Sequence, residues 1–349
     1  MTRPKPDFQR FRAAITREHL PDRIPAAEVA VDFEVMEAFL GEPITDLKTY
    51  VSFWEKAGYD YTLLQVRSQP IADAFQIKIA DGLIASKPQT ETNTIRTFGS
   101  SKIKNEKSFD EYPWIGPNDV YYKDVDLIKQ YLPDGMKVIV NHGPIFQFLF
   151  RAMGIETLSV ASIENPQLVA AIAEKVGLLG INIVENLLQR EWVGGIWYGD
   201  DMGYTEGLLV SPDFLRKYVF GYVKQMGQLC RQHQKLFILH SDGKLEQILD
   251  DLNDCGFHAI HPNEPLSVDI VKLKQQVGDR FALIGNVDVD LLSRGSEEDV
   301  IKATKYLIEN VAPGGGFALG SGNSVAKFIP LANYKAMLET IRQCGCIYS

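Results

Sequence analysis

Two short stretches of the sequence place a histidine and a carboxylate near the end of an apolar run. In 235–242, KLFILHSD, the run ends on His240 and Asp242, and in 258–264, HAIHPNE, a second run leads to Glu264. Residues two apart in an extended chain project from the same face, so His240 and Asp242 should point the same way. A neutral imidazole beside a carboxylate suits metal ligation, general base catalysis or a histidine oriented by the acid. We therefore predict catalytic or metal-binding roles for His240 and Asp242, with Glu264 a further candidate for catalysis or metal.

Structural roles compete with these assignments. Asp242 could cap a helix that starts near Lys244, and His240 could bond a loop carbonyl. His258 precedes the interior of its apolar run and is expected to be structural. Both interpretations of His240 and Asp242 stay open at this stage.

A pair of adjacent aspartates, Asp200 and Asp201, follows a third apolar run in 196–207, IWYGDDMGYTEG. Neighbouring residues of a strand face opposite ways, so at most one of the two enters a shared cavity. The other is expected to cap a loop or hold an arginine. We predict that Asp200 or Asp201 acts on the substrate.

Eight apolar runs could position these groups, and helical patterns lie between them. Their hydrophobicity is continuous rather than alternating, which is typical of parallel strands buried on both faces. The predicted strands are Pro25–Val31, Tyr61–Val66, Lys137–Asn141, Gly195–Tyr198, Lys235–His240, His258–Pro262, Phe281–Val287 and Gly316–Gly320. Eight strand–helix units predict an α/β (β/α)8 barrel, a TIM barrel, as a single domain over 1–349; a doubly wound open sheet is the alternative.

The spacing of the runs is irregular at one place, between the second and third predicted strands. Within the segment 68–120, the stretch 79–101 is rich in Thr, Ser and Gly and contains short β-like pieces. We expect a β-hairpin excursion over the barrel mouth rather than a separate domain.

In parallel barrels the functional groups gather at the carboxyl ends of the strands. Every predicted strand exit here carries a polar group: Glu28, Gln65 and Arg67, Asn141 and His142, Asp200 and Asp201, His240 and Asp242, His261 and Glu264, Asn286 and Asp288, Ser321 and Asn323. Asn141, Ser321 and Asn323 are our candidates for holding a substrate or cofactor. An anion site in 320–323, GSGN, is a weaker interpretation.

Composition narrows the class of protein. The 349 residues are 45% hydrophobic, and 36 Lys and Arg against 45 Asp and Glu give a formal net charge of -9, which disfavours a nucleic-acid partner. We expect no signal peptide, because the N-terminus is polar and lacks the apolar core of roughly 7–15 residues that such a peptide needs. We also expect no membrane span, because no uncharged apolar run reaches the roughly 18 residues required. Four cysteines are too few for a disulfide framework, so a cytoplasmic protein is expected.

Several motifs together resemble the uroporphyrinogen decarboxylase superfamily of (β/α)8 barrels, over nearly the whole chain. They are PDRIPAAE, FRAMGIE, YGDDMGYTEGLLVSPDFLRKYV, LHSDG, HPNEP and VAPGGGFALGSGNSV followed by FIPLANY. The superfamily includes cofactor-free decarboxylases and corrinoid-linked methyltransferases. The decarboxylases carry an arginine-rich segment after the first strand, where this chain has Glu28, Asp32 and Glu34. These acids would repel a tetrapyrrole bearing eight carboxylates.

The resemblance is therefore nearer the methyltransferase branch, in which zinc is held by H-x-C and a later cysteine. This chain has His240-Ser241-Asp242 at the first motif and Ser321 at the later position. The histidine is kept and both thiolates are replaced. Oxygen ligands do not exclude zinc, so the resemblance allows a His240–Asp242–Glu264 metal site.

The expected function is methyl transfer between a corrinoid (methylcobalamin or a corrinoid protein) and a small molecule, assisted by zinc where a metal is bound. The alternative is a cofactor-free decarboxylase acting on a smaller substrate, with Asp200 or Asp201 as the acid. A third interpretation is a corrinoid- or ligand-binding barrel that has lost its chemistry. The expected partners are a small-molecule substrate and a corrinoid protein, and a homodimer is compatible with the sequence.

Overall fold

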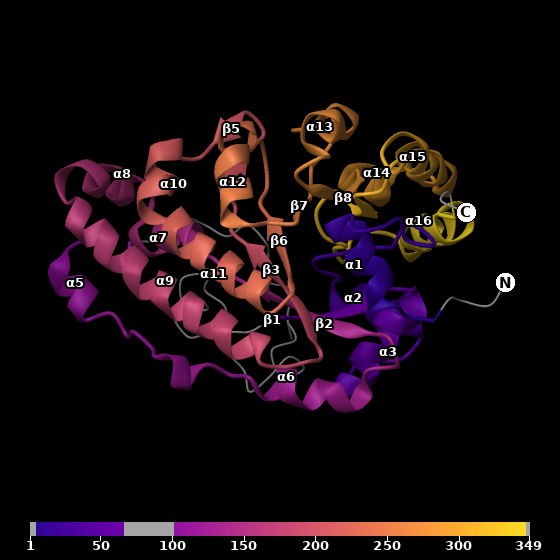
Figure 1. The fold of residues 1–349 in the computed structure, drawn as a ribbon, viewed down its shortest axis with the longest axis horizontal. Coiled ribbons are helices and arrows are strands. Elements are labelled where there is room, and N and C mark those ends of the chain that lie inside the picture. Colours follow the sequence, from indigo (N-terminus) through magenta and orange to yellow (C-terminus); the bar gives the residue numbers. More distant parts are fainter. Residues whose placement is uncertain (1–4, 66–100, 347–349) are drawn as a thin grey trace.

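The computed structural model describes residues 5–65 and 101–346, and its centre is a curled parallel sheet (Figure 1). Seven strands form this sheet in the order β1-β2-β3-β6-β7-β8-β9. They are β1 Tyr61–Gln65, β2 Lys137–His142, β3 Val193–Gly199, β6 Leu236–His240, β7 Ala259–His261, β8 Ala282–Val287 and β9 Phe317–Ser321. Each coincides, within one or two residues at either end, with a strand predicted from an apolar run.

Helices connect successive strands and cover the outside of the sheet. Those before β3 are α1 Phe8–Thr16, α2 Phe33–Leu40, α3 Leu47–Ala57, α5 Glu106–Asp110, α6 Lys123–Leu127, α7 Phe146–Met153, α8 Ile155–Glu164 and α9 Pro166–Leu188. Those after β3 are α10 Pro212–Tyr218, α11 Phe220–Gln232, α12 Leu249–Cys255, α13 Ile270–Val277, α14 Val289–Arg294, α15 Glu297–Asn310 and α16 Leu331–Cys344. Short 3-10 turns are η1 Pro117–Asp119, η2 Ile128–Tyr131 and η3 Glu246–Ile248. Ser211, Asn165 and Ser296 cap the first turns of α10, α9 and α15.

The predicted first strand, Pro25–Val31, is not a strand of the sheet. It contacts β9 through an isolated bridge at Ala26–Leu319, and Val31 bridges to Val325 just beyond β9. On its other side the Tyr61 hydroxyl of β1 donates to the Glu28 carbonyl and accepts from the Glu28 N–H. A side chain thus takes the place of backbone pairing, so the continuous eight-strand ladder is not formed among the described residues.

Helix α1 lies across the amino end of the sheet. Its Arg10 pairs with Asp60, directly before β1, while Arg12 donates to the Gln234 carbonyl before β6. Phe11 and Ile15 have no exposed surface, and the Phe11 and Tyr61 rings lie 4.7 Å apart. The helix therefore plugs the amino end, and the described βα loops gather at the other end.

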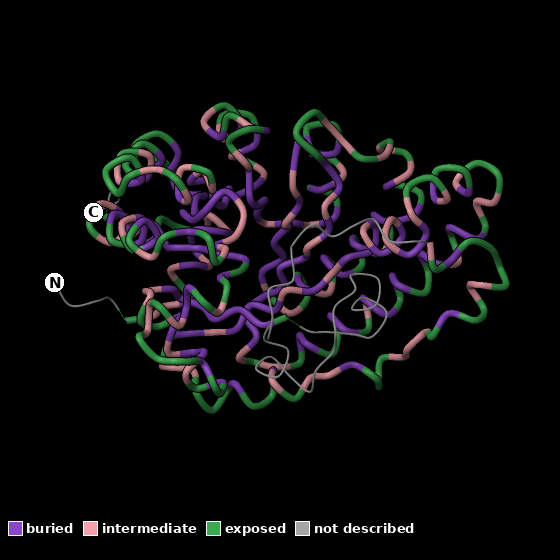
Figure 2. The backbone as a smooth tube through the Cα atoms, turned by 180° about the vertical axis from the view of Figure 1, so that it is seen from behind, coloured by how far each residue is buried: buried purple, intermediate pink, exposed green. Residues whose placement is uncertain are grey.

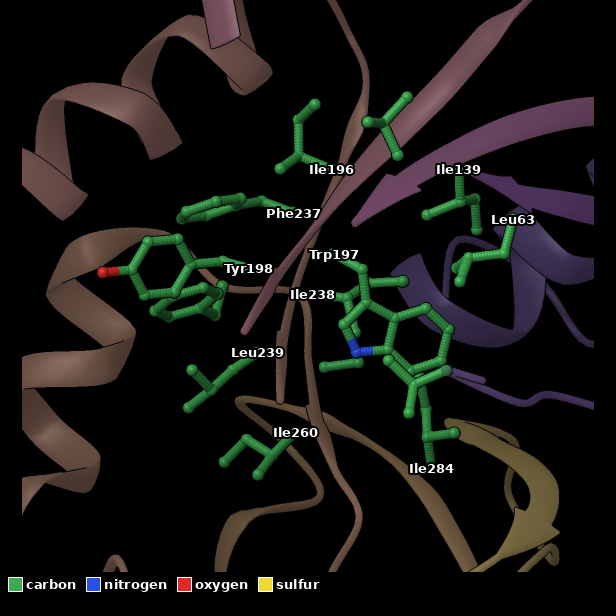
Figure 3. Close-up of a cluster of buried hydrophobic side chains, with 14 of the residues drawn as sticks. Leu63, Ile139, Ile196, Trp197, Tyr198, Phe237, Ile238, Leu239, Ile260 and Ile284 are labelled. Atoms are coloured by element: carbon green, nitrogen blue, oxygen red, sulfur yellow. The ribbon is translucent and has the colours of Figure 1, made fainter. Parts of the chain in front are cut away.

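Both faces of the sheet are packed, as continuous apolar runs require. Buried residues follow the central strands, and exposed residues lie on the outer helices (Figure 2). Adjacent residues of β3 separate the two faces: Trp197 lies with Ile238 and Ile284, whereas Tyr198 lies with Phe237 on the opposite side (Figure 3). Trp197 is wholly buried. Its face of the sheet, toward the sheet's hollow, is called the inner face below.

The loop after β3 carries a small antiparallel hairpin, β4 Gly203–Tyr204 and β5 Gly207–Leu208. The hairpin predicted within 68–120 falls largely on residues 66–100, which lie outside the described part of the chain; 101–120 hold α5 and η1. One described helix, α9, is long and apolar enough to span a membrane by length and composition. Of its most apolar 18-residue window, 56% is buried, as in the core helix of a protein.

Candidate functional site

His240 ends β6 and faces the inner side of the sheet, beside the last residue of β7. Parallel pairing sets His240 opposite His261, and their Nδ1 atoms lie 2.8 Å apart. His261 is wholly buried, and its ring lies nearly perpendicular to the Trp197 ring, with the two ring centroids 5.1 Å apart. This leaves the Nε2 atom of His240 directed at the loops beyond the strands.

Two carboxylates flank that nitrogen. Nε2 of His240 lies 3.6 Å from an oxygen of Asp201 and 3.8 Å from one of Asp242. The three side chains are partly exposed, at 16% for His240, 29% for Asp201 and 36% for Asp242, so a ligand can reach them from the mouth. Asp201 also accepts hydrogen bonds from the Asp242 N–H and from the Gln147 amide.

Asn323 joins this group to Glu264. Its amide nitrogen donates to Asp242 at 2.9 Å and to Glu264 at 3.0 Å. Glu264 also accepts, at 3.4 Å, from the N–H of Gly243. Glu264 therefore belongs to the same polar cluster as His240 and Asp242, but one amide separates it from Asp242.

The cluster is rich in negative charge. Burial, and then the charge of Asp201, raise the pKa of Asp242 to about 6; His240 opposes the rise. Burial also places the pKa of His261 well below the usual value of an imidazole, so His261 is neutral. Among the described residues no Lys or Arg pairs with Asp201, Asp242 or Glu264. A cation is what this arrangement lacks.

Asp200 has a structural role and does not belong to the cluster that contains Asp201. It is wholly buried, and its carboxylate accepts from the N–H groups of Ile145, Phe146 and Gln147 and from the Tyr198 hydroxyl. Burial raises the pKa of Asp200 to about 6, and these four donors oppose the rise. Asp200 thus fixes the start of α7, and the member of the pair that faces the cluster is Asp201.

The remaining candidates lie around the same rim. Asn141 is the register partner of Trp197 and so lies on the inner face, and a Cβ added to Gly199 would lie 3.4 Å from its Oδ1. Ser321 is wholly buried, and its N–H and hydroxyl both donate to Glu28. Ser321 is thus engaged by Glu28, whose pKa is raised to about 8 by burial.

Two members of the site were not singled out from sequence. His261 was noted only as a strand-end residue, and Gln147, from the first turn of α7, was not considered. The signal for His261 is its spacing from the end of its apolar run, which equals that of His240. Using it requires knowing that β6 and β7 are neighbours and in which register they pair.

Ligand atoms of Asp201, His240 and Asp242 all lie within 4.8 Å of one another. Two ligands that share one ion at roughly 2.1 Å lie about 3.4 Å apart in a tetrahedral shell. The 3.6 Å and 3.8 Å separations at His240 come close to that spacing. One nitrogen and two oxygens form a donor set that zinc and harder divalent cations both accept, without any thiolate.

The curled parallel sheet, the helices outside it and the histidine–carboxylate cluster at its carboxyl end place this protein among the TIM-barrel-like α/β proteins. The chain belongs to the uroporphyrinogen decarboxylase (URO-D) family, whose sequence model matches residues 49–344.

Curated relatives fall into two groups. A methylcobamide:CoM methyltransferase, MtaA, of Methanosarcina barkeri is 31% identical over 131 residues, which are 37% of this chain and 36% of that protein. A uroporphyrinogen decarboxylase of Chlorobaculum tepidum is 27% identical over 144 residues, or 40% of each chain. The matched stretch thus spans about two fifths of these relatives.

Among solved structures, a methyltransferase from Methanosarcina mazei superimposes with a TM-score of 0.72. The superposition covers 95% of this chain and 97% of that one at 18% identity. The two proteins therefore share their fold.

Proposed function

We propose that this protein transfers a methyl group between a corrinoid and a small molecule at the cluster formed by His240, Asp201 and Asp242. The observation that carries the proposal is the convergence of these three ligand atoms within 4.8 Å at the carboxyl end of a sheet shared with methyltransferases. The similarity to the methylcobamide:CoM methyltransferase supports the same reaction type.

The residues of the mouth suit a corrinoid better than a porphyrinogen. Asp201, Asp242 and Glu264 repel carboxylates, whereas the amides of Asn323 and Gln147 can bond the amide side chains of a corrin ring. The corrinoid would supply or accept the methyl group, presented by a separate corrinoid protein or free in solution. Its small-molecule partner would lie over His240.

His240, Asp201 and Asp242 would hold a divalent cation, zinc on the family resemblance. When bound, the cation would act as a Lewis acid on the heteroatom that gains or loses the methyl group. Asn323 keeps Asp242 in place, and Glu264 is near enough to take a proton or a ligand position as the substrate enters. The oxygen-rich set favours an oxygen or nitrogen heteroatom over a thiol.

The experiment that tests this function mixes purified protein with methylcobalamin and, separately, with cob(I)alamin. Thiols, pterins and methoxylated compounds are offered as partners, and the cobalt absorption is followed. Elemental analysis should find about one divalent metal ion per chain. An unchanged cobalt spectrum with every partner, in protein that holds its metal, would contradict methyl transfer.

A second candidate function is a metal-free decarboxylase acting on a smaller acid, as the URO-D relatives suggest. The specific observation in its favour is Asp242, whose pKa near 6 lets it deliver a proton at neutral pH. Release of carbon dioxide from small carboxylic acids, without metal or corrinoid, would identify it. For either function we propose a cytoplasmic enzyme, active as a monomer or homodimer.

A further inference from the structure

His261 lies directly behind His240, which is the hydrogen-bonding partner of its Nδ1 among the described residues. Besides the 2.8 Å approach of the two Nδ1 atoms, the ring centroids of the two histidines lie 5.0 Å apart. Nε2 of His261 is buried and has no hydrogen-bond partner among the described residues. No neighbour therefore fixes a proton on the far side of the His261 ring.

Two nitrogens 2.8 Å apart share a single proton. If both carried one, the hydrogens would collide; if neither did, two lone pairs would face each other. One Nδ1 therefore donates and the other accepts. The ring whose Nδ1 accepts then carries its own proton on Nε2, so the direction of this one hydrogen bond sets the state of the outer nitrogen of His240.

The two arrangements differ at the outer nitrogen of His240. When His261 donates, His240 accepts at Nδ1 and its own proton lies on Nε2, where it points at Asp201 and Asp242. When His240 donates, its Nε2 has a free lone pair, which suits a metal ion and is repelled by bare carboxylates. The first arrangement fits the site without a cation and the second fits the site with one.

We propose that His261 is a positioning residue, which moves the proton of His240 between its two ring nitrogens according to what is bound at Nε2. This inference rests on the proposed function, because it concerns the same metal centre. A ligating histidine more often donates to a carboxylate or backbone carbonyl, groups that accept only. An imidazole can both donate and accept, so it can serve both states of the site.

The test compares two substitutions of His261. His261→Leu keeps the approximate volume and removes the partner, whereas His261→Asn places an amide near the position of Nδ1 that can donate or accept. Zinc affinity is measured by competition with a chelator. We expect His261→Leu to weaken zinc binding about 10- to 100-fold and His261→Asn to stay within about threefold of wild type.

The control is His258→Asn, because His258 is a second buried histidine, near the amino end of β7, whose Nδ1 accepts from the Phe237 N–H. It should leave zinc affinity unchanged. Circular dichroism checks that each variant is folded. Wild-type zinc affinity in folded His261→Leu would overturn the proposal, and so would equal losses in the Leu and Asn variants.

A spectroscopic measurement keeps this inference separate from the proposed function. With 15N-labelled histidine, NMR should show one protonated Nδ1 in the pair, on His261 without zinc and on His240 with zinc. Should the wild type bind no zinc, the metal-assisted function fails, but the zinc-free spectrum still decides the inference. An Nδ1 proton on His240 in the zinc-free protein, or a zinc-free His240 tautomer unaltered in His261→Leu, would overturn it.

Discussion

The two ends of the parallel sheet treat charge in opposite ways. At the amino end, Arg10 pairs with Asp60 at 2.6 Å, and Lys274 donates to the backbone carbonyls of Gly315 and Gly316. At the carboxyl end, Asp201, Asp242 and Glu264 have only one imidazole and neutral amides as partners among the described side chains. The amino-end charges are thus neutralised within the fold, whereas the acids of the proposed metal site have no Lys or Arg partner among the described residues.

The largest effect should come from His240→Ala at the carboxyl end. Loss of the only nitrogen ligand should leave the protein folded, lower the bound metal to under about 0.1 ion per chain, and slow methyl transfer about 10³-fold, or about 4 kcal/mol. Metal analysis and the cobalt absorption assay measure both. The control is His233→Ala, which follows α11 and precedes the amino end of β6. Equal losses in the two variants would contradict a special role for the carboxyl end.

At the amino end, Arg10→Met should cost stability instead of metal. Asp60 would remain buried without its cation, which typically destabilises a protein by about 3 kcal/mol or more. Burial raises the pKa of Asp60 to about 7, so the loss should shrink below pH 7 as the acid is protonated. Urea unfolding at pH 6 and 8 measures it. The exposed pair Arg294–Asp290 supplies the control, since water already screens it and Arg294→Met should leave stability nearly unchanged.

The adjacent residues Asp200 and Asp201 allow a stabilising carboxylate to be compared with a proposed metal ligand within one loop. Asp200→Asn should destabilise the fold by about 2 kcal/mol, because an amide cannot accept from all four donors, and should keep the metal. Asp201→Asn should do the reverse, weakening metal binding about tenfold with little change in unfolding. Thermal melts with and without zinc separate the two outcomes. Equal changes in stability and in zinc affinity for the two variants would contradict the assignment of Asp200 as a helix cap and Asp201 as a metal ligand.

The last prediction concerns Glu28, whose carboxylate has no cation partner among the described residues and accepts hydrogen bonds there from Ser321 alone. Its pKa in the folded protein is about 8, above that of an unfolded glutamate, so its contribution to stability is full below about pH 4 and is lost as the pH rises through 8. Glu28→Gln should therefore lie close to wild type near pH 5 and be the more stable of the two at pH 9. Unfolding free energies of both proteins at the two pH values provide the test; a difference between them that does not change with pH would show that Glu28 is ionised throughout.

The strands were predictable because burial on both faces leaves an unbroken apolar run, and all seven runs from Tyr61 onward became strands of the sheet. The exception is Pro25–Val31, which is apolar like the others but meets a tyrosine hydroxyl instead of backbone on one side. A pattern of residue types reports burial, and it does not report which neighbour supplies each hydrogen bond.

The candidate site was predictable in its residue types and less so in its contacts. The rule that strand ends converge brought His240, Asp242 and Glu264 onto one list. The division of labour between Asp200 and Asp201 depends on where α7 starts, more than 50 residues away in the chain. The contact between His240 and His261 depends on strand register. Both are tertiary facts with no local sequence pattern.

Helix α1, which plugs the amino end of the sheet, also restricts the route by which ligands reach His240. With that end filled by Phe11 and Ile15, whatever reaches His240 has to enter and leave through the same rim. In the proposed reaction a bulky methyl carrier and a small co-substrate would then use the same entrance to the site. The fold would thus restrict the order in which the two bind and leave.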